Sequence, residues 1–365
     1  MAIRMPIVMV QGPKTANLLS VWGDTLTSVR IRDAVGHESD TCTLTFRVAP
    51  PFPAMPPKGT RYSVQIGWAR DAMALAGIYT VQRTGLTGDP EGGHTMSVEC
   101  RAADLIDTAK SVDSGHWDQA TLGTIVSDVA KGLGLQVVVD PALKAIAIPY
   151  RARVQQEALD FLSDLADDFG GAIKVAGGKL MMTERGAGRT ASGGALPTLT
   201  IAYDPAYDFA FDFEPRGAYR TSQGRWYDEA TGLWQDEDDE SDSGKGRLAR
   251  PHPWPSKDEA RHGARAAARE RSRQSATGQV TVAGDPAAVA GCPVKVTGFG
   301  PDADGTAWCA ESVEHHIEPG SGWITTLTLE TKEAAQSKSD SEDESGDSAS
   351  GTGTMAGDPE GGTVA

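Results

Sequence analysis

The sequence predicts a mainly β protein in which a small α/β unit is inserted between two related β-barrels. Three observations lead to this fold class. Short runs of alternating apolar and polar residues occur toward both ends of the chain. Between about residues 115 and 185 the period changes to that of amphipathic helices. Finally, a spaced set of glycines, aromatic residues and β runs occurs twice.

The first predicted domain, residues 1–112, is a β-barrel. Clusters of Gly and Pro separate its apolar–polar runs, as in the turns of antiparallel sheets. Strands are expected at residues 41–48, 61–68, 77–82 and 95–100.

The second predicted domain, residues 113–188, combines helices and strands. One helix is expected after Asp118, which we take as its N-cap, because apolar residues then recur every three or four positions. A second helix carries an apolar stripe from Leu159 to Phe169 and precedes a hairpin with a Gly-Gly turn. This region is therefore expected to fold as a small α/β domain.

The third predicted domain, residues 189–333, is a second β-barrel. It contains an acidic segment rich in Ser and Gly, residues 228–250, which is expected to be a mobile loop. A helix is expected over residues 256–272, because Ser256 and Glu259 fit the S-x-x-E capping box.

The acidic charge is concentrated in two segments. The formal net charge is −16, and the run 236–242 contributes six acids without a base. Residues 334–365 contribute seven acids and one base and have little apolar character, so they are expected to be a disordered acidic tail. The remaining body is close to neutral, which argues against nucleic-acid binding over the whole surface.

The repeat relates residues 59–99 to residues 291–330. Its markers are Gly59, Gly67 and Trp68 in the first unit and Gly291, Gly298 and Phe299 in the second. The offset is 232 residues for the first glycine of each unit and 231 for the second, and the same spacing pairs Val81 with Val313. Three chains with two similar barrels each would present six barrels in a ring, so a trimer would match a sixfold ring.

Three stretches of the chain stand in a characteristic order. They are VRIRDAVGHESDTCTLTF at residues 29–46, YRARVQQEALDFLSDLADDFGGAIKVAGGKLMMTE at residues 150–184, and the closing segment 284–331. In this order they resemble the late control protein D family of contractile-tailed phages, the baseplate hub proteins, over roughly residues 5–333. The plan is also similar to the hub-like part of type VI secretion spike proteins. The resemblance implies that both barrels are of the tail-tube type.

The resemblance implies a structural baseplate hub that is not an enzyme and needs no cofactor. Its expected partners are two further copies in a homotrimer, the tail tube protein on one face, the spike protein on the other, and other baseplate proteins. DNA would be only cargo in the lumen. The hub would nucleate tube assembly and would belong to the virion baseplate, after assembly in the bacterial host cytoplasm.

Three alternatives stay open beside this interpretation. The same residues fit a hub of a tailocin or of a secretion injector. A tail-associated peptidoglycan hydrolase belongs to another class, and a zymogram would distinguish it. A carbohydrate-binding β protein is the third, and it should expose an aromatic platform.

The third predicted helix and two tryptophans form the candidate partner interface. Arg261, Arg265 and Arg269 recur at every fourth position, which places them on one helix face. A solvated face or contact with passing DNA are alternatives, but interleaved aromatic residues that would stack on bases are lacking. Trp226 and Trp234 flank the acidic segment and are suited to anchoring a partner.

The sequence supports no catalytic or metal site. The acids of the second predicted helix recur opposite its apolar stripe, at Asp160, Asp164, Asp167 and Asp168. That spacing is typical of a solvated helix face rather than of paired catalytic carboxylates. No G-x-S-x-G motif, P-loop or dinucleotide fingerprint occurs.

The remaining metal candidates are two histidines and two cysteines. His315 and His316 are adjacent in a predicted strand, so their side chains point to opposite faces and cannot readily share one ion with Cys292 or Cys309. The four cysteines of the chain show no CxxC spacing and are expected to be reduced and buried.

Overall fold

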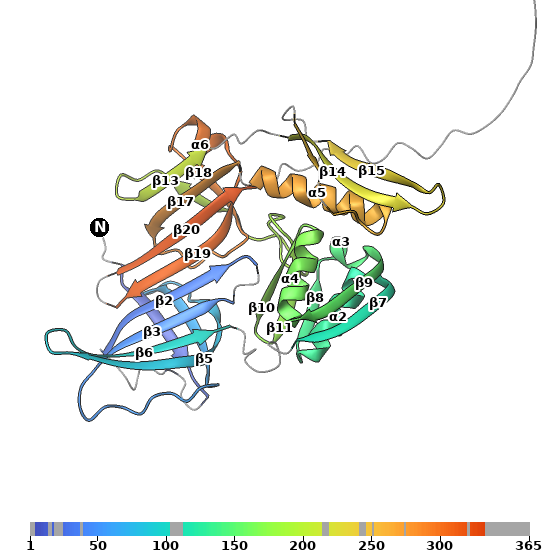
Figure 1. The fold of residues 1–365 in the computed structure, drawn as a ribbon. Coiled ribbons are helices and arrows are strands. Elements are labelled where there is room, and N and C mark those ends of the chain that lie inside the picture. Colours follow the sequence, from blue (N-terminus) through green and yellow to red (C-terminus); the bar gives the residue numbers. More distant parts are fainter. Residues whose placement is uncertain are drawn as a thin grey trace, which may run out of the picture. The chain divides into compact units, whose positions relative to one another are not determined.

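The computed structural model describes residues 4–13, 17, 25–36, 39–102, 112–213, 219–240, 246–249, 252–273, 275–319 and 322–332. The predicted acidic tail, residues 334–365, lies outside these residues. Residues Met1–Glu333 form one compact unit, whose arrangement is drawn in Figure 1.

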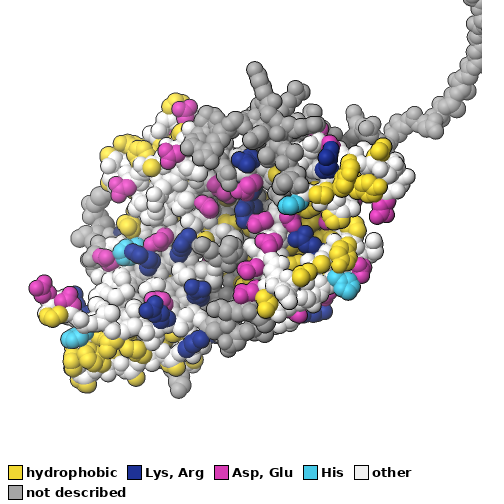
Figure 2. Space-filling view, viewed as in Figure 1, with side chains coloured by type: hydrophobic (Ala, Val, Ile, Leu, Met, Phe, Trp, Pro, Cys, Tyr) yellow, Lys and Arg dark blue, Asp and Glu magenta, His cyan; other side chains and the backbone are white. Residues whose placement is uncertain are grey.

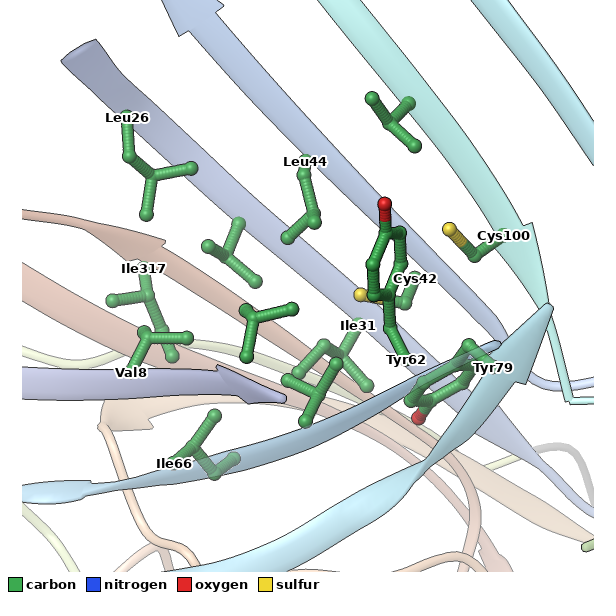
Figure 3. Packing of buried hydrophobic residues seen from close by; sticks show 14 of the residues in the cluster. Val8, Leu26, Ile31, Cys42, Leu44, Tyr62, Ile66, Tyr79, Cys100 and Ile317 are labelled. Carbon is green, nitrogen blue, oxygen red and sulfur yellow. The ribbon is translucent and has the colours of Figure 1, made fainter. Parts of the chain in front are cut away.

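Six antiparallel strands build the first β domain. They are β1 (Pro6–Gln11), β2 (Leu26–Ala34), β3 (Thr41–Val48), β4 (Arg61–Trp68), β5 (Ala74–Asp89) and β6 (Gly93–Arg101). Their order in the sheet is β1-β4-β5-β6-β3-β2. Because successive side chains alternate between the two faces of a strand, the alternating sequence turns one face toward a core. Leu44, Tyr62 and Tyr79 belong to this core, which Figure 3 shows from close by.

The α/β unit follows in the chain. Its elements are β7 (Asp113–Thr121), α2 (Leu122–Gly132), β8 (Gln136–Val139), α3 (Pro141–Lys144), β9 (Ala147–Gln156), α4 (Ala158–Asp168), β10 (Gly171–Ala176) and β11 (Lys179–Glu184). Strands β10, β11 and β8 form one sheet, and β7 pairs with β9 in another. The apolar stripes of α2 and α4 pack in a common core that includes Ile125 and Leu162.

The start of α2 differs from the prediction. The N-cap is Thr121 and not Asp118, because the Thr121 hydroxyl accepts from the N–H of Thr124 at 3.2 Å. Asp118 lies three residues earlier, within β7. This strand is mostly polar and exposed, so it carries no hydrophobic alternation that would predict it.

The second β domain is built from six strands and a short helix. They are β12 (Leu199–Ala202), β13 (Asp208–Phe213), β17 (Ala276–Ala283), β18 (Pro293–Thr297), α6 (Pro301–Gly305), β19 (Trp308–Glu318) and β20 (Gly322–Thr331). Its core contains Trp308, Val313 and Leu327. The predicted mainly β fold with an α/β insertion is confirmed.

The acidic segment predicted as a mobile loop contains two strands. A three-stranded sheet joins β14 (Tyr219–Asp228), β15 (Leu233–Glu240) and β16 (Gly246–Ala249). The acids of β15 are tolerated because basic groups stand beside them: Arg225 pairs with Asp236 at 3.0 Å and Lys257 with Glu237 at 3.8 Å. The prediction from composition alone is wrong where these strands lie.

Helix α5 (Lys257–Arg273) covers one face of this small sheet. The predicted capping box is confirmed, since Ser256 Oγ accepts from the N–H of Glu259 at 3.3 Å and donates to its carboxylate at 3.0 Å. At Gly224 of β14, a Cβ would lie 2.1 Å from the carbonyl oxygen of Ala260. Glycine is therefore required for the helix to approach this closely.

The two β domains share one twelve-stranded sheet. Its main path is β1-β4-β5-β6-β3-β2-β19-β20-β17-β13, and β12 and β18 attach beside β19. Strand β2 has β3 on one edge and β19 on the other, so it joins the domains (Figure 1). None of the described helices has both the length and the hydropathy of a membrane span.

Candidate assembly surfaces

The predicted repeat corresponds to a pair of equivalent turns. Gly59 and Gly291 both adopt positive φ angles, 85° and 82°. The N–H of Gly59 donates to the carbonyl of Val81 at 2.9 Å, and that of Gly291 to the carbonyl of Ala310 at 2.7 Å. Each acceptor residue donates its own N–H back to the residue after the glycine, at 2.9 and 3.0 Å.

A β-bulge marks the same place in both units. The register shifts directly after Val81 in β5 and directly after Ala310 in β19. Two residues earlier, each strand buries a large ring, Tyr79 in β5 and Trp308 in β19. These strands are therefore equivalent at an offset of 229 residues. The structural partner of Val81 is Ala310, three residues before the Val313 that sequence spacing predicts.

The second glycine of each unit has its own surroundings. Gly298 has a φ of 85°, and the N–H groups of Gly298 and Phe299 donate to the Asp304 carboxylate at 2.8 and 3.0 Å. Gly67 lies within β4, where a Cβ would come within 3.1 Å of the Cα of Met73. The two glycines occupy similar places in sequence for different physical reasons.

The aromatic markers also differ. Trp68 is buried, and its Nε1 donates to the carbonyl of Gly284 in the second β domain at 2.9 Å. Phe299 instead packs in an aromatic cluster of the second domain, with ring centroids 5.0 Å from Phe209 and 5.5 Å from Phe211. Trp68 therefore binds the domains together, and Phe299 lines the edge of one of them.

The arginines of the candidate interface have two environments. Arg261 is exposed on α5, whereas Arg265 and Arg269 are half-buried. Arg269 forms an ion pair with Glu184 at the end of β11. This part of the predicted interface is occupied within the chain, by contact between α5 and the α/β unit.

The two tryptophans of the candidate interface also differ in their environments. Trp226 is half-buried, and its Nε1 donates to Glu237 at 3.4 Å. Trp234 is 54% exposed, and its ring lies 5.2 Å from that of Tyr227 on the neighbouring strand. Hydrophobic side chains gather on the surface around the β14–β15 hairpin (Figure 2).

A charged junction that sequence reasoning missed joins the three parts of the chain. Lys174 of β10 pairs with Asp33 of β2 and, at 3.1 Å, with Asp40. The Asp33 carboxylate also accepts from the N–H of Ala290 at 2.9 Å. Lys174 and Asp33 are 141 residues apart, so no local pattern could have paired them.

Burial sets the electrostatics of this junction. It raises the pKa of Asp40 from 3.8 to about 6, although the positive charge of Lys174 acts in the opposite direction. For Lys174, burial lowers the pKa, but the carboxylates of Asp33 and Asp40 outweigh this effect, so the pKa is raised overall. The lysine therefore stays charged while the junction holds.

Three of the four acids considered for catalysis are engaged in structural contacts. Asp164 accepts from the side-chain amide of Gln156 at 2.6 Å. Asp167 pairs with Arg185 at 3.2 Å, and Asp168 pairs with an arginine of β9 at 2.9 Å. Asp160 lies in the first turn of α4.

The side chains considered for a metal site are histidines and cysteines. His315 is buried and hydrogen-bonded to Thr325 at 2.9 Å, whereas the half-buried His316 lies 3.6 Å from Glu318. Burial lowers the pKa of His315 from 6.5 to about 4. The cysteines are free and buried, at Cys42, Cys100, Cys292 and Cys309. Within the described ranges, no group of three His, Cys, Asp or Glu side chains is placed to hold a metal ion.

Comparison with known proteins agrees with this architecture. The probable baseplate hub protein of Escherichia phage P2 is 32% identical over 203 residues, and that of Escherichia phage 186 is 29% identical over 210 residues. These matches cover 56% and 58% of this chain, and 52% and 53% of the relatives. The matched part thus spans about half the length of these curated relatives.

Solved structures share the fold over most of the chain. The 43 kDa tail protein of prophage MuSo2 from Shewanella oneidensis has a TM-score of 0.61 at 17% identity and covers 88% of this chain and 97% of its own. The E. coli c3393 protein, described as a type VI secretion component with similarity to the T4 tail proteins gp27 and gp5, has a TM-score of 0.52 at 11% identity, covering 88% of this chain and 76% of its own. The family of phage tail baseplate hub (GPD) proteins matches residues 46–321, and this chain belongs to that family.

Proposed function

We propose that this chain forms a homotrimeric hub ring that joins the tail tube to the central spike and nucleates tube assembly. Membership of the baseplate hub family supports a place in the baseplate. The observation that carries the ring is the joint between β2 and β19, which fuses two similar barrels into one sheet.

Symmetry links this joint to a trimer. Each chain supplies two barrel units with equivalent turns and bulges. Three chains in a closed ring present six such units at nearly equal steps, and this number matches a sixfold tail tube. The tube would bind one face of the ring, the spike the other, and DNA would pass through the lumen as cargo.

Two exposed features support contacts with other baseplate proteins. Arg261 is exposed on α5, and Trp234 with Tyr227 forms an exposed aromatic pair on the β14–β15 hairpin. Exposed aromatic residues of this size are typical anchors of protein interfaces. The role is structural rather than enzymatic, and the hub acts in the virion baseplate after assembly in the host cytoplasm. A tailocin or secretion-injector hub would use the same geometry.

Deletion of the chain from its own particle tests the proposal. Particles that lack it should contain no tail tubes, and supplying the full chain in trans should restore them. Electron microscopy of the lysate reads both results. Normal tubes of ordinary length in the deletion strain would overturn the hub role, and clearing of a peptidoglycan zymogram by the purified chain would instead favour the hydrolase.

A further inference from the structure

The joint between the two barrels gives a template for a joint between two chains. In this internal joint, β2 pairs antiparallel with β19 from Val29 opposite Ile317 to Ala34 opposite Ser312. Strand β19 has this edge available because β18 pairs with β19 only near its start, at Trp308 and Cys309. The second half of β19 is thus left to bind β2.

The repeat assigns an equivalent to each strand of this joint. The shared bulge makes β5 equivalent to β19 at an offset of 229 residues. In the first β domain, Cys42 of β3 pairs with Ile31 of β2 on one side and with Cys100 of β6 on the other. In the second, Gly278 of β17 pairs in the same way with Phe211 of β13 and with Leu329 of β20. Strand β13 is therefore equivalent to β2, and Phe211 to Ile31.

Among the described residues, both equivalent strands have an edge to which no other strand is paired. Strand β4 pairs with β5 from Ala74 to Thr80, so the second half of β5 has β6 on one side and, in the described part of the chain, no strand on the other. Strand β13 pairs with β17 and, among the described residues, with no other strand. An exposed edge of this kind offers unpaired N–H and C=O groups to another strand.

The exposed fractions of apolar side chains also show that these two strand edges are uncovered. Leu86 of β5 stands opposite buried Met96, on the core face of the sheet, yet it is 41% exposed. Its equivalent in β19, His315, is 4% exposed. Phe209 of β13 is 46% exposed, whereas its equivalent Val29 is 0% exposed. The apolar residues of both free edges lack the cover that the internal joint provides.

We propose that β13 of one chain adds to the free edge of β5 in a second copy, antiparallel and with Phe211 opposite Leu86. This register is that of Ile31 opposite His315 in the internal joint. It places Phe209 opposite Gly88. Backbone hydrogen bonds extend the sheet, and the exposed apolar side chains of both edges become covered.

The interface is head-to-tail, because β13 and β5 are different surfaces. A head-to-tail contact closes into a ring when its rotation divides a full turn evenly. The inference rests on the proposed hub function and deepens it by naming the partner and the residues of the ring contact. Asp208 and Asp89 would stand opposite each other one residue beyond the pair of Phe209 with Gly88. The internal joint also ends at the equivalent place, at Val29 opposite Ile317.

Two variants of the full chain, each with one introduced cysteine, test the register. Thr87→Cys on β5 and Ala210→Cys on β13 are exposed positions that the proposed register places directly opposite each other. The native cysteines are buried, so they contribute little background. After treatment with a short thiol cross-linker, the mixture should give a covalent dimer, and either variant alone should give none. No dimer in the mixture, or a dimer from one variant alone, overturns the proposal.

A matched control comes from the neighbouring strand. Thr95 pairs with Thr87 across β5 and β6, so Thr95→Cys lies one strand farther from the proposed partner. Mixed with Ala210→Cys, it should give no covalent dimer. Equal cross-linking from this position would show that β13 does not lie beside β5.

A second pair of variants tests the energetics on one strand. Leu86→Lys places a charge in the proposed joint, and Leu75→Lys makes the same change at a 60% exposed site in the part of β5 that β4 already covers. Leu86→Lys should weaken self-association at least roughly tenfold by sedimentation velocity, and Leu75→Lys should leave it unchanged. Equal effects of the two variants overturn the joint.

The outcomes separate the two proposals. If cross-linking fails but the deletion strain still lacks tubes, the hub role stands and the joint is wrong. If cross-linking succeeds and the deletion strain makes normal tubes, the joint stands and the hub role is wrong.

Discussion

The rings of Trp68 and Trp323 lie 5.1 Å apart between centroids, one at the end of β4 and the other at the start of β20. Both side chains are buried and belong to the core of the first β domain. Together with the bond from Trp68 to Gly284, this contact makes the core of one domain depend on residues of the other. The two β domains are therefore not separable units of stability.

Trp68→Ala should destabilise the chain by about 3–5 kcal/mol, because it removes a buried ring and leaves a cavity. Trp68→Phe should cost much less, since it keeps a ring and loses mainly one hydrogen bond, worth about 1 kcal/mol. Urea unfolding measures both. The exposed Trp234→Ala serves as the control, and a loss as large as that of Trp68→Ala would contradict the assignment.

Asp40 should make stability fall as the pH rises. Its pKa is raised by burial from 3.8 to about 6, so the folded chain holds this proton more tightly than the unfolded chain. The contribution of Asp40 is present below pH 3.8 and is lost as the pH rises through about 6. Relative to Asp40→Asn, the wild type should lose up to about 2–3 kcal/mol over this range. If the difference in the free energy of unfolding between wild type and variant is the same below pH 3.8 and above about pH 6, the effect is ruled out.

His315 should have the opposite effect. Burial lowers its pKa from 6.5 to about 4, so the unfolded chain binds the proton more tightly. Its contribution to stability is present above pH 6.5 and is lost as the pH falls through about 4. In His315→Gln, which does not titrate, this part of the acid sensitivity should disappear from unfolding curves. Unchanged acid sensitivity in the variant would argue against the assignment.

Gly59→Ala and Gly291→Ala should each destabilise the chain by about 1–2 kcal/mol, because a side chain is strained at positive φ. No atom would crowd a Cβ at either position, so the cost is one of backbone conformation. Gly132→Ala at the end of α2, where the space is also open, should be neutral or slightly stabilising. Equal costs at all three positions would contradict this reason.

Arg269→Glu should lower stability rather than only weaken a partner contact. It breaks the half-buried pair with Glu184 and sets two carboxylates together, at a cost of about 1–3 kcal/mol. The double variant Arg269→Glu, Glu184→Arg should recover part of the loss, which thermal unfolding can measure. Arg261→Glu, on the exposed side of α5, should leave the unfolding temperature nearly unchanged. A loss at Arg261 equal to that at Arg269 would remove the distinction.

The repeat was predictable from sequence where backbone geometry demands a residue type. Gly59 and Gly291 have positive φ angles that favour glycine, so they remain visible after the rest of the repeat has diverged. The second unit has three fewer residues between Gly291 and Ala310 than the first has between Gly59 and Val81, and no residue type in the sequence reveals this difference. The predicted pairing of Val81 with Val313 was therefore wrong. The capping box of α5 was predictable because it is local.

What the sequence could not predict depends on distant partners. Strand β7 is polar and exposed, so only its pairing with β9 defines it. The acids of β15 are stabilised as a strand by Arg225, Lys257 and α5, none of which composition reveals. The pair of Arg269 with Glu184 joins residues 85 positions apart, and the same arginine spacing would suit an exposed helix face.

The joint between β2 and β19 also determines when this sheet can be finished during synthesis. Strand β2 ends at Ala34, whereas its partner stretch in β19 begins at Ser312. At roughly 5–20 residues per second, a ribosome needs on the order of 15–60 s to make the intervening chain. During this interval the edge of β2 has no cognate strand in its own polypeptide, so it can be covered from within the chain only after most of the chain has been made.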